Sequence, residues 1–194
     1  MAKASKHTSQ LRIIGGQWRG RKLSIPDIDG LRPTGDRIRE TLFNWLAADI
    51  PESTCLDLFS GSGALALECL SRGAAHVTLL EQHPQAYRTL KQHCHTLQTK
   101  HADVIEADCL AWLEQTKVEP HSIDIAFIDP PFSLDLWQRT IDLLAQSQLL
   151  KNNARVYVET PRNTLLHTPA SWTLHKEKQA GQVCYRLFDY CEVT

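Results

Sequence analysis

The stretch Cys55-Leu-Asp-Leu-Phe-Ser-Gly-Ser-Gly-Ala-Leu-Ala66 decides how this chain folds. It opens with a short apolar run typical of a buried strand over 55–59, turns through Gly61 and Gly63, and continues into a helical pattern over 64–71. Glycines in such a turn adopt positive φ angles and let the backbone approach a ligand closely. The stretch therefore predicts a strand, a ligand-binding loop and a helix.

The same alternation of strand and helix continues after this stretch. Further strands are predicted over 77–81, 104–108, 123–128 and 155–159, with helices over 84–97, 110–115 and 134–147. Such alternation gives a parallel sheet covered by helices on both faces. Two runs without a helix between them, 172–178 and 183–192, predict an antiparallel hairpin at the sheet edge. The fold class is therefore α/β.

Two smaller elements precede the sheet. Residues 13–26 hold short apolar runs around glycines, which predict a small β-hairpin followed by a turn at residues 29–30. Apolar side chains then recur at helical spacing and predict a helix that ends near Asp49. Either Thr34 or Asp36 is available as the N-cap of this helix.

Length and composition limit the architecture. With 194 residues, 42% of them hydrophobic, the chain can bury one sizeable core but is too short for two full-sized domains. We expect residues 51–194 to form the main domain, and residues 1–50 a basic arm, hairpin and leading helix. Apolar runs fall short of the roughly 20 residues of a membrane span, and a secretory signal is absent. Six scattered cysteines without a C-x-x-C pair favour a cytoplasmic protein and argue against a zinc site.

Charge is unevenly distributed along the chain. Residues 1–40 contain nine lysines and arginines against four acids, whereas the whole chain has a net charge of −1. A basic arm on an acidic body suits a partner with a phosphate backbone, although a solvated tail explains the first ten residues equally well. Trp18, Arg19, Arg21 and Lys22 combine aromatic and basic character, which binds RNA through stacking and phosphate contacts. Trp18 is equally suited to anchor the arm as a hydrophobic residue.

Acidic residues stand at the ends of the first two strands of the sheet, on the edge where α/β proteins bind ligands. Gly61, Gly63 and Ala66 also match a looser dinucleotide fingerprint, so a nicotinamide oxidoreductase is a competing interpretation. Asp57 discriminates between a nicotinamide dinucleotide and S-adenosylmethionine, because a carboxylate there repels the pyrophosphate of the first and attracts the methionyl ammonium of the second. Glu81 ends the second strand, where an acid accepts hydrogen bonds from the ribose hydroxyls of either cofactor.

Three other loop residues have alternative roles. Asp108 ends the third strand and either accepts the adenine amino group of the cofactor or caps the following helix. Ser60 and Ser62 lie in the glycine loop without a histidine placed in sequence to activate them. They are therefore interpreted as turn residues, with Ser60 beside the cofactor, and a hydrolase is excluded.

Asp129-Pro-Pro-Phe132, directly after the fourth strand, is the most specific feature. Pro130 and Pro131 cannot continue a strand ladder and hold the backbone rigid, which fixes the Asp129 side chain and the Pro130 carbonyl as two acceptors. Two acceptors match an exocyclic NH2 group and favour its tetrahedral, nucleophilic form. Asp129 is also suited to take the departing proton, and Phe132 to stack on a flipped-out base. The alternative is a plain strand-ending turn.

These motifs together resemble class I methyltransferases, and more closely the RsmD family of 16S ribosomal RNA guanine-N2 methyltransferases. The resemblance covers nearly the whole chain. It is carried by Arg12-Ile-Ile-Gly-Gly16, Trp18-Arg-Gly-Arg21, Arg32-Pro-Thr-Gly-Asp-Arg-Ile-Arg-Glu-Thr-Leu-Phe-Asn44, Asp57-Leu-Phe-Ser-Gly-Ser-Gly63 and Asp129-Pro-Pro-Phe132. Glycine loops and D-P-P-F occur in many amine methyltransferases, whereas the block that starts at Arg32 resembles this family in particular.

The resemblance implies a seven-stranded Rossmann-like sheet and methyl transfer from S-adenosylmethionine to the N2 amine of one guanine, guanine 966, in 16S ribosomal RNA. The implied partner is an assembled or assembling small ribosomal subunit, with no metal required. The resemblance also suggests that Thr34 and Arg37 lie near the cofactor or the target, and we assign Arg12, Arg32 and Arg37 to RNA binding.

Two rival functions remain open. D-P-P-F recognises an amino group and not a particular base, so a DNA adenine-N6 methyltransferase is the nearest alternative. The short chain leaves little room for a DNA target-recognition domain. The second rival function is a non-catalytic RNA-binding protein on the same scaffold, and the intact Asp129 argues against it.

Overall fold

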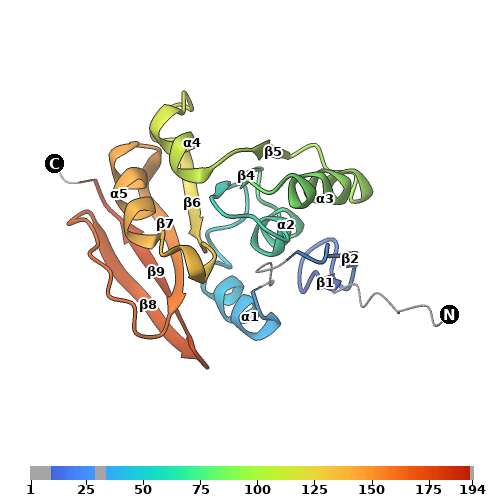
Figure 1. Ribbon diagram of the computed structural model, residues 1–194, viewed down its shortest axis with the longest axis horizontal. Coiled ribbons are helices and arrows are strands. Elements are labelled where there is room, and N and C mark those ends of the chain that lie inside the picture. The colour runs from blue at the N-terminus through green and yellow to red at the C-terminus, as the bar shows by residue number, and fades with distance from the viewer. Residues whose placement is uncertain (1–9, 29–33, 193–194) are drawn as a thin grey trace.

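The computed structural model describes residues 10–28 and 34–192 (Figure 1). The turn predicted at residues 29–30 and the RNA-binding role assigned to Arg32 fall outside the described residues. The elements are, in chain order, β1 Gln10–Arg12, β2 Lys22–Ser24, α1 Asp36–Trp45, β3 Thr54–Asp57, α2 Ala64–Ser71, β4 His76–Glu81, α3 Pro84–Thr96, β5 Ala102–Glu106, α4 Cys109–Gln115, β6 Ile123–Ile128, the 3-10 turn η1 Phe132–Leu134, α5 Trp137–Gln146, β7 Leu150–Pro161, β8 Trp172–Ala180 and β9 Val183–Tyr190.

A seven-stranded sheet forms the centre of the molecule, in the order β5-β4-β3-β6-β7-β9-β8. The strands from β5 to β7 in this order are parallel, whereas β9 pairs antiparallel with both β7 and β8. The predicted mostly parallel sheet with an antiparallel carboxyl-terminal hairpin is therefore confirmed. The winding order reverses between β3 and β6, so the carboxyl ends of these two strands flank the place where α/β folds bind ligands.

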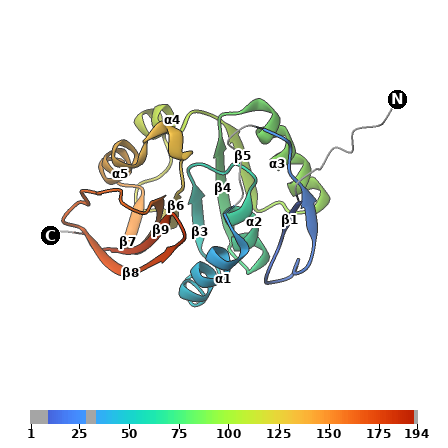
Figure 2. The same ribbon diagram turned by 60° about the horizontal axis from the view of Figure 1, so that its bottom comes forward.

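Both faces of the sheet are covered by helices, because successive strand residues point to opposite sides. Cys55 of β3 packs in the hydrophobic cluster that includes residues of α1, α2 and α3, whereas the adjacent Leu56 packs in the cluster that includes α4 and α5. In Figure 2, α4 and α5 lie on the opposite side of the strands from α1. Within the described residues, we find no helix with the length and apolar character needed to cross a membrane.

The small hairpin β1–β2 lies beside α2 and α3, at the far end of the molecule from β8 and β9 (Figures 1 and 2). The buried carboxylate of Glu68 in α2 accepts the backbone N–H groups of Ile14 and Gly15 at 2.9 and 2.7 Å. A side chain at Gly16, where φ is +71°, would place its Cβ 1.7 Å from the carbonyl oxygen of Ser71. The glycine pair therefore permits the close contact between the hairpin and α2.

Arg39 of α1 completes this buried contact. Its side chain is 1% exposed and donates to the carbonyl oxygens of Thr34 at 3.1 Å and Arg12 at 2.9 Å. The guanidinium also lies 3.7 Å from the carboxylate of Glu68. Breaking one partner out of a buried ion pair costs about 3–5 kcal/mol, so these contacts hold the hairpin, α1 and α2 together. Arg39 is a core residue, although composition alone counts it with the basic arm.

Several element boundaries differ from the sequence prediction by a few residues, including α1, which ends at Trp45 and not near Asp49, and two of the differences have a clear structural reason. The helix predicted over 134–147 is divided into η1 and α5, because Asp135 adopts a left-handed φ of 49° that interrupts the helix. The strand predicted over 155–159 extends over 150–161. Pairing with β6 on one side and β9 on the other supplies the hydrogen bonds for this longer strand.

The predicted N-cap of α1 is wrong. Gly35 occupies the cap position, and no side chain caps the helix. The Thr34 hydroxyl donates to the Asp129 carboxylate at 3.1 Å instead, and the Asp36 carboxylate accepts from Arg39 at 2.6 Å. Thr34 is therefore recruited by a tertiary contact, and Asp36 by a local i,i+3 contact within α1.

Candidate active site

A cavity of about 670 Å³ opens at the carboxyl ends of the central strands, within the range of about 300–1,000 Å³ typical of small-molecule sites. It brings together segments that are far apart in the sequence, from the end of β3 to the end of β7. The predicted site residues that line it are Thr34, Asp57, Ser60, Gly61, Glu81, Asp108, Asp129, Pro130, Pro131 and Phe132.

The loop after β3 is held against the end of β4. The backbone N–H of Gly61 donates to Glu81 Oε2 at 2.8 Å, and the N–H of His83 donates to Glu81 Oε1 at 2.7 Å. The Ser60 hydroxyl donates to the carbonyl oxygen of Asp57 at 3.1 Å. This geometry agrees with the interpretation of Ser60 as a turn residue, and it fixes the Glu81 carboxylate at the cavity wall.

Gly63 does not line the cavity, although its neighbours Ser62 and Ala64 do. It precedes α2 with a left-handed φ of 81°, and a Cβ at this position would lie 2.7 Å from Leu90 Cδ2 and 3.1 Å from Leu67 Cδ1. The glycine is therefore required for the turn into α2 and for packing against α3, whereas Gly61 lines the cavity itself.

Asp57 is a buried acid, only 2% exposed, on the floor of the cavity. Burial is the main cause that raises the pKa of Asp57 from 3.8 to about 7, and the negative charge of Glu81 raises it further. Hydrogen bonds from the chain, led by the N–H of Phe59, lower the pKa in part. Among the described residues that line the cavity, none is a lysine or arginine. The cavity therefore favours a cation and opposes a pyrophosphate.

Asp129 follows β6, and its side chain is held by the Thr34 hydroxyl at 3.1 Å. Burial and the charges of Glu159 and Asp57 raise the pKa of Asp129 well above its ordinary value, whereas the Thr34 hydrogen bond lowers it. The Phe132 ring is 43% exposed and packs edge-on against Trp137, with 5.7 Å between the ring centroids. A carboxyl group and an exposed aromatic face therefore stand together at the cavity mouth.

Glu159 is a site residue that the sequence analysis missed. It lies in β7, lines the cavity, and accepts a 2.7 Å hydrogen bond at Oε2 from the Tyr157 hydroxyl. Burial raises the pKa of Glu159, and the Tyr157 hydrogen bond lowers it. The available signal was its position at the end of the predicted strand 155–159, by the same rule that selected Asp57, Glu81 and Asp129.

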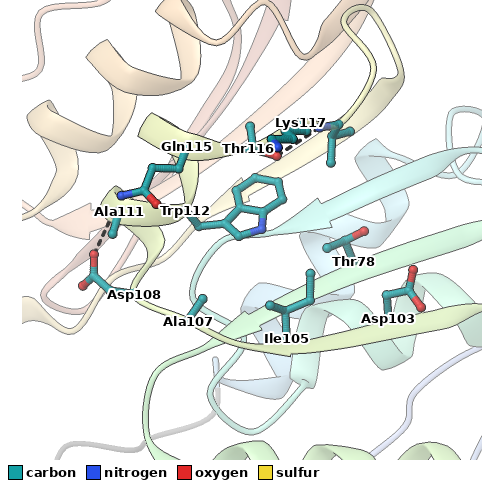
Figure 3. A pocket seen from close by; sticks show the side chains of 11 residues that line it. Thr78, Asp103, Ile105, Ala107, Asp108, Ala111, Trp112, Gln115, Thr116 and Lys117 are labelled. Carbon is teal, nitrogen blue, oxygen red and sulfur yellow. Dashed lines mark hydrogen bonds between the residues drawn. The ribbon is translucent and has the colours of Figure 1, made fainter.

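Asp108 has the geometry of a helix cap. Its Oδ1 accepts the backbone N–H of Ala111 at 2.9 Å, as Figure 3 shows at the start of α4. The residue also lines the cavity, so its cap role leaves the other carboxylate oxygen for a ligand. Figure 3 further shows the Trp112 ring in a separate groove between α4 and the strands β4 and β5.

The sequence matches a known family over nearly its full length. A family described as conserved hypothetical protein 95 matches residues 11–189. Ribosomal RNA small subunit methyltransferase D from Escherichia coli strain K12 is 51% identical, over 93% of this chain and 90% of that protein. This chain belongs to the RsmD family. A member from Haemophilus influenzae is 49% identical over 92% of this chain and 93% of that protein.

A solved structure of this family has the same fold. A putative methyltransferase from Escherichia coli superimposes with a TM-score of 0.87 at 48% identity, covering 94% of this chain and 99% of that chain. The recognised family and the predicted class I methyltransferase fold are therefore both confirmed. Among the described residues that line the cavity, Ile28 and Thr34 come from the part of the chain that precedes the seven-stranded sheet.

The residues assigned to RNA binding that the structure describes do not line the cavity. Arg12, Arg19, Arg21 and Lys22 are exposed on or beside the β1–β2 hairpin, and Arg37 is exposed on α1. Trp18 is half-buried and packs against the hydrophobic cluster of α1, α2 and α3, which agrees with its interpretation as an anchor. The exposed basic residues therefore lie outside the cavity lining, and the hairpin that carries most of them contacts Ser71 at the carboxyl end of α2.

Proposed function

We propose that this protein transfers a methyl group from S-adenosylmethionine to the exocyclic N2 amine of a guanine in 16S ribosomal RNA. One observation carries the proposal: a single cavity combines the buried Asp57 with Asp129-Pro-Pro-Phe132 and lacks lysine and arginine among its described lining residues. The first feature suits a cationic cofactor and the second an aromatic amine. The names of the relatives, which are ribosomal RNA small subunit methyltransferases, support an RNA substrate.

The residues of the cavity fit S-adenosylmethionine by their chemistry. Asp57 would attract its ammonium group, Glu81 would accept hydrogen bonds from its ribose hydroxyls, and Asp108 would face its adenine amino group. Gly61 and Ser60 would allow the backbone to approach it, with Thr34 beside Asp129. The bound cofactor supplies an electrophilic methyl group on a positively charged sulfur. Its positive charge would favour the ionised forms of the buried acids.

Asp129 and the Pro130 carbonyl would orient the amine that receives the methyl group. Each accepts one N–H of the NH2 group, which directs the nitrogen lone pair away from the aromatic ring. As the nitrogen forms its bond to the methyl carbon, the bond from that carbon to sulfur would break and leave its electron pair on sulfur. One of the two protons of the nitrogen would pass to the Asp129 carboxylate and then to solvent. Phe132 would stack on the displaced guanine. No covalent enzyme intermediate and no metal are needed for this route.

The substrate we propose is guanine 966 within an assembled or assembling small ribosomal subunit, in the cytoplasm. Five of the six cysteines are buried thiols, as in a protein of a reducing compartment. The exposed basic residues Arg12, Arg19, Arg21, Lys22 and Arg37 would contact phosphates of the RNA around the target.

Nucleoside analysis tests this function directly. The protein is incubated with radiolabelled S-adenosylmethionine and small subunits from cells that lack the enzyme, and the RNA is digested to nucleosides. We expect label in N2-methylguanosine with the native protein and its loss in Asp129→Asn. Asp103→Asn, an exposed acid on β5, is the matched control and should retain the activity.

Other outcomes distinguish the rival functions. Label in N6-methyladenine, with DNA as substrate, would establish the adenine methyltransferase, because the acceptor pair at Asp129 fits either amine. Cofactor binding without transfer to any nucleic acid would favour a non-catalytic RNA-binding protein. Binding of a nicotinamide dinucleotide in place of S-adenosylmethionine would refute our interpretation of Asp57.

A further inference from the structure

Two acidic residues stand side by side where β6 and β7 reach the cavity. These strands are parallel neighbours in which Phe127 pairs with Tyr157 and Ile128 with Val158. The next residues in the same register are Asp129 and Glu159, and parallel neighbours lie about 4.8 Å apart. Both residues line the same cavity. The charge of Glu159 is one of the causes that raise the pKa of Asp129, which agrees with their proximity.

Each of these two acids is held by one hydroxyl group. Thr34 donates to Asp129 Oδ2 at 3.1 Å, and Tyr157 donates to Glu159 Oε2 at 2.7 Å. Within the described part of the chain, neither Asp129 Oδ1 nor Glu159 Oε1 accepts a hydrogen bond. The pair therefore presents two fixed carboxylate groups, each with one oxygen left for a substrate.

We propose that Glu159 accepts the ring N1–H of the target guanine and thereby selects guanine among bases that carry an exocyclic amine. This inference rests on the proposed function. Guanine carries N1–H and the N2 amine as adjacent donors on one edge, so its amine can lie at Asp129 and Pro130 while N1–H faces Glu159. A charged acceptor strengthens such a hydrogen bond relative to a neutral one.

Other bases with an exocyclic amine have a hydrogen-bond acceptor at the ring nitrogen beside the amine, where guanine has its N1–H donor. Adenine and 2-aminopurine have an unprotonated ring nitrogen at N1, which offers a lone pair to the Glu159 carboxylate. Two acceptors that face each other in a buried site leave both unsatisfied, and such a mismatch is strongly rejected. Asp129-Pro-Pro-Phe132 thus binds the amine, whereas Glu159 distinguishes the ring beside it.

The side chain of Glu159 is separable from the backbone contact at the same position. The Trp137 indole N–H donates to the carbonyl oxygen of Glu159 at 2.6 Å, so the main chain fixes the end of β7 whatever the side chain. Glu159→Gln keeps the size of the side chain and can still accept from Tyr157, but it removes the charge and adds an N–H donor. That donor can satisfy the N1 lone pair of 2-aminopurine.

The test compares two target bases within each variant. Small subunits are reconstituted with 16S RNA that carries either guanine or 2-aminopurine at the methylated position, since 2-aminopurine keeps the N2 amine and lacks N1–H. We expect the native protein to prefer guanine about 10- to 100-fold in kcat/KM, the effect of one hydrogen bond to a charged group. In Glu159→Gln the preference should fall to within about threefold. Glu106→Gln, an exposed acid at the end of β5 outside the cavity, should keep the native preference.

The ratio between the two bases is measured within one preparation, so partial unfolding of a variant lowers both rates and leaves the ratio unchanged. Calorimetric binding of S-adenosylmethionine shows that each variant is folded. An unchanged guanine preference in Glu159→Gln would overturn the inference, as would equal rates on both bases with the native protein. Failure of the native protein to form N2-methylguanosine on the guanine subunits would instead refute the proposed function.

Discussion

Replacing Asp57 by asparagine should stabilise the ligand-free protein while weakening its binding of S-adenosylmethionine. Asp57 is 2% exposed, and the described residues that line its cavity include no lysine or arginine. Asparagine has nearly the same shape and can still accept the N–H of Phe59, but it cannot carry the negative charge. The substitution therefore isolates the cost of a buried charge.

The magnitude follows from the raised pKa. Asp57 changes its pKa from 3.8 to about 7 on burial, so the folded protein binds this proton more tightly than the unfolded chain does. Ionisation of Asp57 then opposes folding, and its cost grows as the pH rises from about 4 to about 7. Linkage gives a cost of about 2 kcal/mol at pH 5.5 and about 4 kcal/mol at pH 8. The variant lacks this cost at every pH.

Urea unfolding of the native protein and Asp57→Asn at pH 5.5 and pH 8, without cofactor, measures the effect. The difference in the free energy of unfolding between the variant and the native protein should grow by about 2 kcal/mol from pH 5.5 to pH 8. Titrations common to both proteins cancel in this difference. Calorimetry should show about tenfold or greater loss of S-adenosylmethionine affinity in the variant. A stability difference that does not change with pH would refute the raised pKa, and unchanged affinity would refute the role of Asp57 in cofactor binding.

Three further predictions concern catalysis, docking of the hairpin and RNA binding. Asp129→Asn should lower kcat about 10²- to 10⁴-fold in a methyl-transfer assay while calorimetry shows nearly unchanged cofactor affinity. Gly16→Ala should cost about 3 kcal/mol or more in urea unfolding, because its Cβ would overlap a carbonyl of α2. Gly20→Ala, also at positive φ but with open space around it, should cost only about 1 kcal/mol. Arg19→Ala combined with Arg21→Ala should reduce the slope of log affinity for RNA against log salt by up to about 2 in filter binding, and an unchanged slope would exclude phosphate contacts there.

The sequence was most informative where the spacing of apolar residues along the chain matches the side of a strand or helix that is buried. The alternation of strand and helix patterns that begins at Cys55 predicted a sheet covered on both faces. The strand and helix periodicities could be recognised because they are local properties of the chain. The candidate site residues Asp57, Glu81 and Asp129 could be selected because a parallel sheet brings the carboxyl ends of its strands to one edge. Glu159 could have been found by the same rule, whereas only the structure showed that β7 lies next to β6 and that Glu159 therefore lies beside Asp129.

Only the tertiary structure decided how polar groups are paired. Thr34 looked like a helix cap and is bound to Asp129, which is 95 residues away, while Arg39 counted as part of a basic arm and is buried against Glu68. Such pairings depend on which distant segments meet, and burial then sets their energy by removing water from the charges. The sequence by itself determined the class of fold, the approximate positions of the strands and the residues with reactive chemistry. The packed structure determined which of those residues face the same cavity and which hold the chain together.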